Sequence, residues 1–560
     1  MVLKPSSQQP AAAGVSFKLS SIFVSGFLFI NVTIMPLKAY ISEPFPWVPR
    51  TSTDYADLCA TNFTACEETL VALFQSRSRS AMVASDSFVF GQAYDLTRQV
   101  ISIPPGIRLP DSSFLLETSY GQFYSERVRT QLLQVGAGLR NASDFHCLQI
   151  SRMAGSAAAY AVFWIEPGPG TDYTFYVGIE LPAYTPLWRW SKFFFRAFLA
   201  VALVHLMWTR YYVHYIHLVR HLRTIGLGAA APATYYVLVG DPTSVVLLHP
   251  GICLAFIFDF FASSDYASRA LVRICQTKNL GVFFIASLYL SRTVWFAYAS
   301  LSAVSHVVLR RVPHLKFAEV DPGLLAIAIF IVAGPVTYLQ SRSLFFIDLY
   351  HFIDTCLLSG AARDEATEGL IGGVLFIFIF GTLPLNYGFG KPATEKIFKQ
   401  SKRALRSMAT RRTTMQSVSE DAYASVDNND LKHRMLVRCS LYSFRHKPIV
   451  YSGGTLNALF LKDPRYKRYG AISQTGADCY VIFRRSGSGD SEVWACVRLS
   501  LLQSARGLFQ IKPKAVGPAP KQDTAPKQDS SDIPPSAVAK LHLRPTIKLD
   551  AGDFGSPWTM

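Results

Sequence analysis

The chain has 560 residues, of which 50% are hydrophobic and only 17% are charged. Soluble domains carry about 25% charged residues, so this composition excludes an ordinary soluble protein. From Gly388 onward there are 28 basic and 14 acidic residues, or +14, whereas residues 41–187 hold 9 basic and 14 acidic residues, or −5. This asymmetry indicates opposite sides of a membrane and disfavours nucleic acid as a partner.

Six apolar segments are each long enough to cross a bilayer as a helix, which takes about 17–25 residues. They are 17–37, 190–210, 243–262, 280–303, 323–341 and 369–387. The third and fifth follow Asp241-Pro242 and Asp321-Pro322, residues that favour a helix start. We therefore predict a mainly α-helical membrane protein with a six-helix transmembrane bundle.

The first segment, 17–37, is predicted to be a signal anchor that follows a cytoplasmic N-terminus, residues 1–16. A cleaved signal peptide is the alternative. Its apolar run is long for such a peptide, and no pair of small residues at cleavage-site spacing follows it. We favour the uncleaved anchor.

Residues 38–189 are predicted to form an α+β extracytoplasmic domain. The runs 160–166 and 173–180, rich in aromatic and aliphatic residues, flank a turn made of Pro and Gly, a pattern typical of a β-hairpin. Cys59 and Cys66 are candidates for a disulfide. Asn62 and Asn141 begin sequons and are candidate glycosylation sites.

Three ionisable residues inside the predicted spans are candidate functional residues: His205, Asp259 and Arg292. Asp259 and Arg292 would neutralise each other if their helices brought them together. Arg292 lies about 18 Å from the outer end of its span, at 1.5 Å per residue, whereas Asp259 lies near the outer end of its own. We therefore expect them to lie apart, with an ion pair as the alternative.

The stretch 344–358 is predicted to be an interfacial helix on the outer leaflet, between the fifth and sixth spans. Asp348, His351 and Asp354 share one face of this helix, and apolar residues share another. A solvated polar face is the preferred interpretation of the three residues, and a metal site is the alternative.

The cytoplasmic part is predicted to have three zones: a basic flexible segment (388–430), a small β-rich module (431–510) and a disordered tail (511–560). Within the module, 478–485 and 492–502 are expected to be strands. Anionic lipid head groups are the expected partners of the first zone. Its candidate lipid-binding residues are Lys391, Lys396, Lys399, Lys402, Arg403, Arg406, Arg411 and Arg412, and its candidate phosphorylation sites are Ser407, Thr413 and Thr414.

The basic block after the sixth span predicts that both termini are cytoplasmic, in the plasma membrane or an endomembrane. Six basic residues on the predicted outer side oppose this orientation: Arg189, Lys192, Arg196, Arg269, Arg273 and Lys278. The larger tail block and the sequons favour it.

Four runs are distinctive in combination: VGDPTSVVLLHP (239–250), LYLSRTVWFAY (288–298), VDPGLLAIAIF with AGPVTYLQ (320–340), and DPRYKRYGAISQTGADCYV (463–481). Together they resemble a family of uncharacterised multi-pass membrane proteins that is abundant in oomycete genomes. The resemblance covers roughly 190–385 and 450–500 and implies the same span layout. It implies no activity and no functional residue.

The sequence contains no catalytic, metal-binding or nucleotide-binding motif that withstands inspection, so no cofactor is expected. The leading hypothesis is a sensor or receptor-like protein whose outer domain detects an unknown ligand. A transporter or channel formed by the helices of 190–387 is the alternative, and an enzyme is the third.

Overall fold

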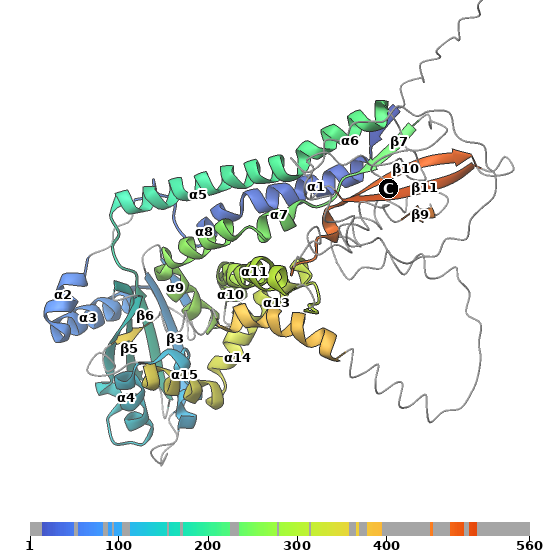
Figure 1. The fold of residues 1–560 in the computed structure, drawn as a ribbon. Coiled ribbons are helices and arrows are strands. Elements are labelled where there is room, and N and C mark those ends of the chain that lie inside the picture. Colours follow the sequence, from blue (N-terminus) through green and yellow to red (C-terminus); the bar gives the residue numbers. More distant parts are fainter. Residues whose placement is uncertain are drawn as a thin grey trace, which may run out of the picture.

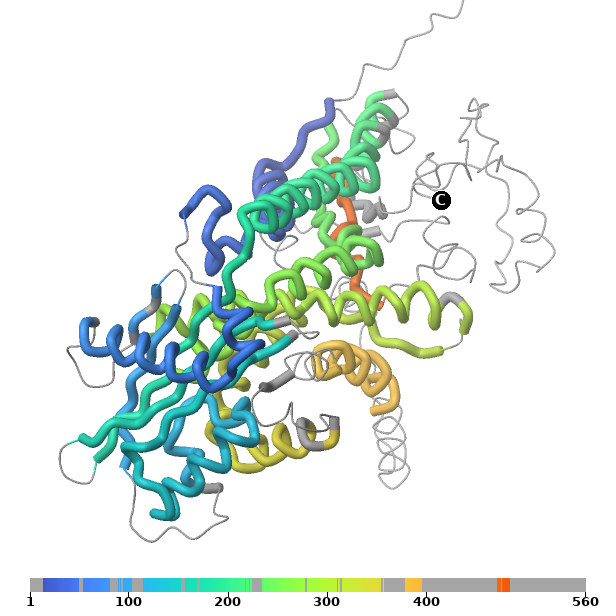
Figure 2. Tube along the Cα trace, turned by 90° about the vertical axis from the view of Figure 1, so that its left-hand side faces the viewer, coloured from blue at the N-terminus to red at the C-terminus, as the bar shows by residue number. Residues whose placement is uncertain are grey.

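Two β-sheets lie at opposite ends of a layer of helices in the computed structural model of the chain (Figure 1). A second view, turned by 90°, shows the same separation (Figure 2). The structure describes residues 14–49, 54–81, 88–91, 94–102, 112–153, 156–168, 172–224, 234–276, 279–312, 315–357, 366–368, 378–394, 449–451, 471–486 and 492–500.

One sheet has six strands in the order β2-β3-β6-β5-β4-β8. The strands are β2 (Phe88–Phe90), β3 (Tyr94–Ser102), β4 (His146–Met153), β5 (Ser156–Pro167), β6 (Asp172–Glu180) and β8 (Ala366–Glu368). Neighbouring strands are antiparallel, except that β8 joins β4 in parallel. The predicted hairpin is confirmed as β5 and β6.

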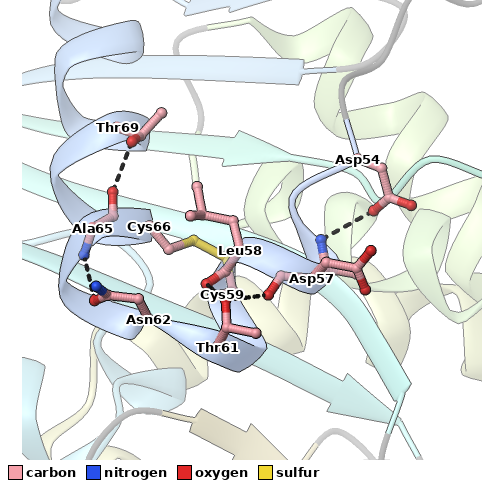
Figure 3. Close-up of a disulfide and its surroundings, with 10 residues drawn as sticks. Asp54, Asp57, Leu58, Cys59, Thr61, Asn62, Ala65, Cys66 and Thr69 are labelled. Atoms are coloured by element: carbon pink, nitrogen blue, oxygen red, sulfur yellow. Dashed lines mark hydrogen bonds between the residues drawn. A yellow bond between two sulfur atoms is a disulfide. The ribbon is translucent and has the colours of Figure 1, made fainter.

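Both faces of the six-stranded sheet are covered because side chains of β5 alternate between two cores. Val162 and Trp164 share a core with helix α3 (Phe63–Ala81). Phe163 shares the other core with helix α4 (Glu126–Gly136). The candidate disulfide Cys59–Cys66 is present and joins α2 (Ala56–Thr61) to α3 (Figure 3).

Within the described residues, three helices of the central layer are long and apolar enough to cross a membrane: Pro186–Arg220, Leu280–Val308 and Pro322–Ser341. The first combines α5 (Pro186–Met207), η5 (Trp208–Tyr212) and most of α6 (Val213–Thr224). The second combines α10 (Leu280–Leu290), η6 (Ser291–Thr293), α11 (Val294–Ala303) and η7 (Val304–Val308). The third combines α13 (Pro322–Ile331), η8 (Val332–Val336) and α14 (Thr337–Ser341).

The other predicted spans differ from single straight helices. Residues 17–37 form α1 (Leu19–Thr33) and the start of η1 (Met35–Ile41), which are bent by 64° and make a fourth span if taken as one. The span 243–262 is broken into α7 (Thr243–Leu247) and α8 (Pro250–Phe261), because Pro250 has no N–H to continue α7. Residues 378–394 are helical, but 369–377 lie outside the described residues. The protein is therefore mainly helical with several apolar helices, and the six-helix bundle stays a prediction.

The second sheet has five strands in the order β1-β7-β10-β11-β9. They are β1 (Gly14–Phe17), β7 (Thr234–Leu238), β9 (Ile449–Tyr451), β10 (Asp478–Ser486) and β11 (Glu492–Ser500). The predicted strands of the tail are confirmed as the hairpin β10–β11. The sheet is not built from 431–510 alone, since β7 pairs with β10 and β1 pairs with β7. A lone hairpin is only marginally stable, and these two partners extend it.

Connections between the helices alternate between the two ends of the layer (Figure 1). Helix α9 (Ser264–Ile274) packs against β5, and β8 follows α15 (Leu344–Leu357) into the six-stranded sheet. The opposite connections supply β1 and β7, and Val320 forms a parallel bridge with Ile472 beside the five-stranded sheet. The segments that the sequence predicts to be cytoplasmic thus lie together at the end of the helical layer that holds the five-stranded sheet.

Candidate functional site

Five charged side chains meet inside the helical layer and form what we call the charge network. Its members are Glu43, Lys192, Arg196, Asp259 and Arg292. They come from four parts of the chain: the residues after η1, helix α5, the last turn of α8, and η6. The network therefore links segments that are far apart in sequence.

Arg196 is the centre of the charge network, and its side chain is 0% exposed. Its Nε donates to Asp259 Oδ1 at 2.7 Å, and Nη1 and Nη2 each donate to a Glu43 carboxylate oxygen at 2.9 Å. Nη2 also donates to Ser263 Oγ at 2.8 Å. Because every guanidinium nitrogen has an acceptor, the buried charge avoids the cost of an unmade hydrogen bond.

Glu43 has further partners on α10 and, beside Arg196, on α5. The Tyr289 hydroxyl donates to Glu43 Oε1 at 2.8 Å, and Lys192 Nζ lies 3.4 Å from Oε2. Burial alone would raise the pKa of the Glu43 carboxyl, but the charges of Arg196 and Lys192 outweigh it and hold that pKa well below its usual range. The carboxylate is therefore ionised throughout the physiological pH range.

Asp259 and Arg292 form an ion pair, so the expectation that they lie apart is wrong. The depth estimate treated the residues between their helices as a loop. Those residues include α9, which packs beside α10, so α10 extends beyond the end of α8. Asp259 consequently lies level with η6, the segment that carries Arg292.

A second buried cluster fixes the six-stranded sheet to the helical layer. Asp95 of β3 accepts hydrogen bonds from Arg269 Nε at 2.9 Å and Arg273 Nε at 2.7 Å, both from α9. Burial raises the pKa of Asp95, but the two guanidinium groups outweigh it and lower that pKa overall. Both arginines are basic residues that opposed the predicted orientation, and here they neutralise a buried acid.

The remaining outer-side basic residues in the described chain also have structural partners. Lys192 and Arg196 belong to the charge network, and Arg189 donates to the carbonyl oxygens of Pro46 and Val48. Lys278 lies outside the described residues. These cations are paired within the fold, so they argue less against the predicted orientation than unpaired flanking charges would.

The other predicted site residues are dispersed. His205 is exposed on α5, away from the contacts of the charge network. Asn62 and Asn141 are both exposed beside the six-stranded sheet, as a glycosylation site requires. Lys391 is partly exposed, and its Nζ donates to the Tyr387 hydroxyl at 3.2 Å. The other candidates lie outside the described residues: Lys396, Lys399, Lys402, Arg403, Arg406, Arg411, Arg412, Ser407, Thr413 and Thr414.

The polar face of α15 contacts α4 of the six-stranded sheet domain. Asp348 pairs with Arg129 at 2.7 Å, and His351 Nε2 lies 3.2 Å from Glu126. The side chain of Asp354 lies outside the described residues. Among the side chains that the structure describes, no three His, Cys, Asp or Glu residues form a candidate metal site. Asp348 and His351 thus contact a neighbouring helix, while the Asp348 side chain stays 51% exposed, which is compatible with a solvated polar face.

Sequence reasoning missed the two central residues of the charge network. Arg196 lies within the predicted span 190–210 and was counted only as a basic flank. Its position inside an apolar helix was the signal that a buried acid had to lie nearby. Glu43, 153 residues earlier in the chain, gave no sign of being that acid.

No protein-family model, curated protein or solved structure matches the chain. The resemblance to the oomycete membrane protein family therefore stays a prediction.

Proposed function

We propose that the protein is a membrane sensor in which the six-stranded sheet domain detects a ligand and the five-stranded sheet relays the change. A single continuous helical rod carries this proposal. The rod, Pro186–Arg220, has 35 residues and runs from the six-stranded sheet to the five-stranded sheet (Figure 1). At 1.5 Å per residue it is about 52 Å long, whereas a hydrocarbon core is about 30 Å thick.

Both ends of the rod are attached to a sheet. The rod starts six residues after Glu180, the last residue of β6. At the other end, Leu218 and Leu222 of α6 share a buried core with Tyr235 of β7 and Val481 of β10. A shift or rotation of the rod at one end therefore changes the packing at the other end.

The charge network supports a coupling role because Arg196 ties the rod to the residues after η1 and to the junction between α8 and α9. Buried ion pairs have few alternative geometries that satisfy all donors, so they favour discrete arrangements over gradual deformation. The Asp95 cluster adds a second connection, from β3 to α9. A rearranged six-stranded sheet can thus act on the helices by two routes.

Three observations support an extracytoplasmic position for the six-stranded sheet. The Cys59–Cys66 disulfide is typical of an oxidising compartment, and Asn62 and Asn141 are exposed sequon residues. The basic block after the last helix favours a cytoplasmic position for the opposite end. We propose a plasma membrane or endomembrane location with both termini in the cytoplasm.

The coupling is tested by hydrogen exchange of the full-length protein in lipid nanodiscs. Asp95→Asn perturbs the six-stranded sheet domain, and exchange is read in 234–238 and 478–486. We expect altered protection there, and we expect insertion of two glycines between Tyr212 and Val213 to abolish that response. Exposed Asp57→Asn is the matched control and should leave both regions unchanged. Identical protection in Asp95→Asn and wild type would refute coupling.

The transporter alternative uses the same charge network as a polar path through the membrane. The two proposals differ in what deletion of 45–185 does. A transporter core that reaches the membrane would still move its substrate, whereas a sensor would lose its response. Flux of a solute through liposomes that contain the protein lacking 45–185 would favour transport. The comparison is the same shortened protein with Arg196→Met, which should lose that flux.

A further inference from the structure

Four exposed aromatic side chains gather at the end of the rod that lies nearest the six-stranded sheet. Phe45 and Trp47, from the chain just after η1, are 39% and 58% exposed. Trp190 and Phe194, from the first three turns of α5, are 38% and 62% exposed. The ring centroid of Trp190 lies 6.3 Å from that of Trp47 and 5.7 Å from that of Phe194. We call these four residues the aromatic patch, and such an exposed apolar surface marks an interaction site.

The chain segment that carries the first two rings of the aromatic patch is held in place. Arg189 Nη1 donates to the Val48 carbonyl oxygen at 3.0 Å, and its Nη2 donates to the Pro46 carbonyl oxygen at 2.9 Å. The Val48 N–H in turn donates to the Phe45 carbonyl oxygen at 3.1 Å and closes a turn. Three prolines lie between residues 44 and 49 and restrict φ there. Rings carried by such a restrained backbone lose little conformational entropy when they bind a partner.

A stack of rings runs from the aromatic patch to the charge network. The Trp47 ring stacks on the Phe45 ring at 4.6 Å between centroids, and the Phe45 ring stacks on Tyr40 of η1, also at 4.6 Å. The guanidinium carbon of Arg196 lies 4.8 Å from the centroid of the Tyr40 ring, which is a cation–π contact. Glu43, in the same segment, binds Arg196 directly. The exposed rings are therefore fixed to the buried centre of the helical layer.

The aromatic patch lies about one hydrocarbon thickness from a second exposed tryptophan of the rod. Trp190 and Trp208 are 18 residues apart, or about 27 Å at 1.5 Å per residue, and a hydrocarbon core is about 30 Å thick. Between them Phe198 and Val201 are 72% and 65% exposed, as lipid-facing side chains should be. Tryptophan is enriched at both interfaces between hydrocarbon and water. This spacing places the aromatic patch level with the head groups of one leaflet.

We propose that the aromatic patch inserts into the boundary between head groups and acyl chains, in the phospholipid leaflet nearest the six-stranded sheet, and anchors this end of the rod there. The indoles of Trp47 and Trp190 suit that boundary, because each has a large apolar ring and one N–H that can donate to water or to a lipid oxygen. Arg189 is then a positioning residue for Trp47. The anchor rests on the proposed membrane location and does not depend on the sensor role.

Fluorescence quenching of the full-length protein in liposomes tests the anchor. The probes are phosphatidylcholine brominated near the head group, phosphatidylcholine brominated near the chain end, and iodide in the water on both sides. The contribution of Trp47 is the difference between wild type and Trp47→Phe, which keeps a ring in the stack. We expect bromine near the head group to quench this contribution more strongly than either other probe. The contribution of Trp208, obtained from Trp208→Phe, reports separately whether the rod lies in the membrane.

A second variant tests the positioning role of Arg189. In Arg189→Met, quenching of the Trp47 contribution by bromine near the head group should fall and quenching by iodide should rise, because both carbonyl contacts of the segment are lost. Exposed Arg223→Met, on α6 at the other end, is the matched control and should change neither quantity. Circular dichroism of each variant shows that a change in quenching is not caused by a lost fold.

The two tryptophans separate the ways in which the proposal can fail. If brominated lipid quenches Trp208 while iodide alone quenches Trp47, the aromatic patch faces water and the anchor is overturned in favour of a soluble partner. Stronger quenching of Trp47 by bromine near the chain end would overturn the interfacial position. If no brominated lipid quenches either tryptophan, the membrane location is wrong, and the anchor fails with it.

Discussion

At the scale of single residues, several partners share each of the central charges in the two buried clusters. Arg196 has hydrogen bonds to two carboxylates and a hydroxyl, and Asp95 receives two guanidinium groups. A buried ion pair adds little net stability compared with apolar packing, but removing one partner leaves an uncompensated charge. Substitutions in these clusters should therefore be costly in proportion to how many partners they leave unpaired.

The first prediction compares two arginines of the charge network. Arg196→Met should cost about 3–5 kcal/mol of folding free energy, because it leaves the buried Asp259 and Glu43 carboxylates without their main donor. Arg292→Met should cost less, since Arg196 still binds both carboxylates. Thermal unfolding of the purified proteins in detergent measures the order, with exposed Arg311→Met as the control. Equal losses for the two variants would contradict the central role of Arg196.

The second prediction concerns pH and Asp95. The pKa of Asp95 is lower in the folded protein than the ordinary value of about 3.9. Its ion pairs therefore stabilise the fold fully above that ordinary value, and the stabilisation is lost as the pH falls through the folded pKa. Wild type should unfold at a higher temperature than Asp95→Asn at pH 7, and the gap should shrink by pH 3. A gap that stays constant over this range would exclude the proposed linkage.

At the scale of elements, the long helices are interrupted rather than uniform. Each of the three long apolar helices contains a five-residue π segment: η5, η7 and η8. In η8 the wider turn contains Pro335, which has no N–H to donate. Gly334, beside this proline, lets η8 approach α10 closely, because a Cβ there would collide with the side chain of Ser287. Gly334 thus permits the close packing that small residues give to membrane helices.

The third prediction tests that close approach. Gly334→Ala should lower stability by about 1–3 kcal/mol, because the added methyl overlaps Ser287. Adding Ser287→Gly to the Gly334→Ala protein should restore much of the lost stability, because it removes the side chain with which the new methyl overlaps. Gly26→Ala is the matched control, since a Cβ at Gly26 meets nothing within 4 Å. Thermal unfolding measures the stability of each variant. Equal changes in Gly334→Ala and Gly26→Ala would show that η8 and α10 are not tightly packed.

At the scale of the whole molecule, the sequence predicted local features better than long-range pairing. Alternating side chains and a turn rich in Pro and Gly were enough to predict β5–β6, because both signals are local. Strand β1 has only four residues, and nothing in it indicates that its partner is β7, more than two hundred residues away. The charge network was missed for the same reason, since Arg196 finds its acids 63 and 153 residues away. The depth argument failed because it required the exact offset of two helices, which α9 determines.

The fourth prediction follows from the five-stranded sheet. Because β1, β7 and β10 are hydrogen-bonded neighbours, the segments that carry them must lie on the same side of the membrane. Epitopes at the N-terminus, at residue 228 and at the C-terminus should therefore all be protected from antibody on intact cells. An epitope at residue 107, within the segment that holds Asn62 and Asn141, should be accessible, and both asparagines should carry glycans in a eukaryotic host. If the epitope at residue 228 and the C-terminal epitope label on opposite sides, these strands cannot pair in the cell, and the rod cannot join the two sheets as proposed.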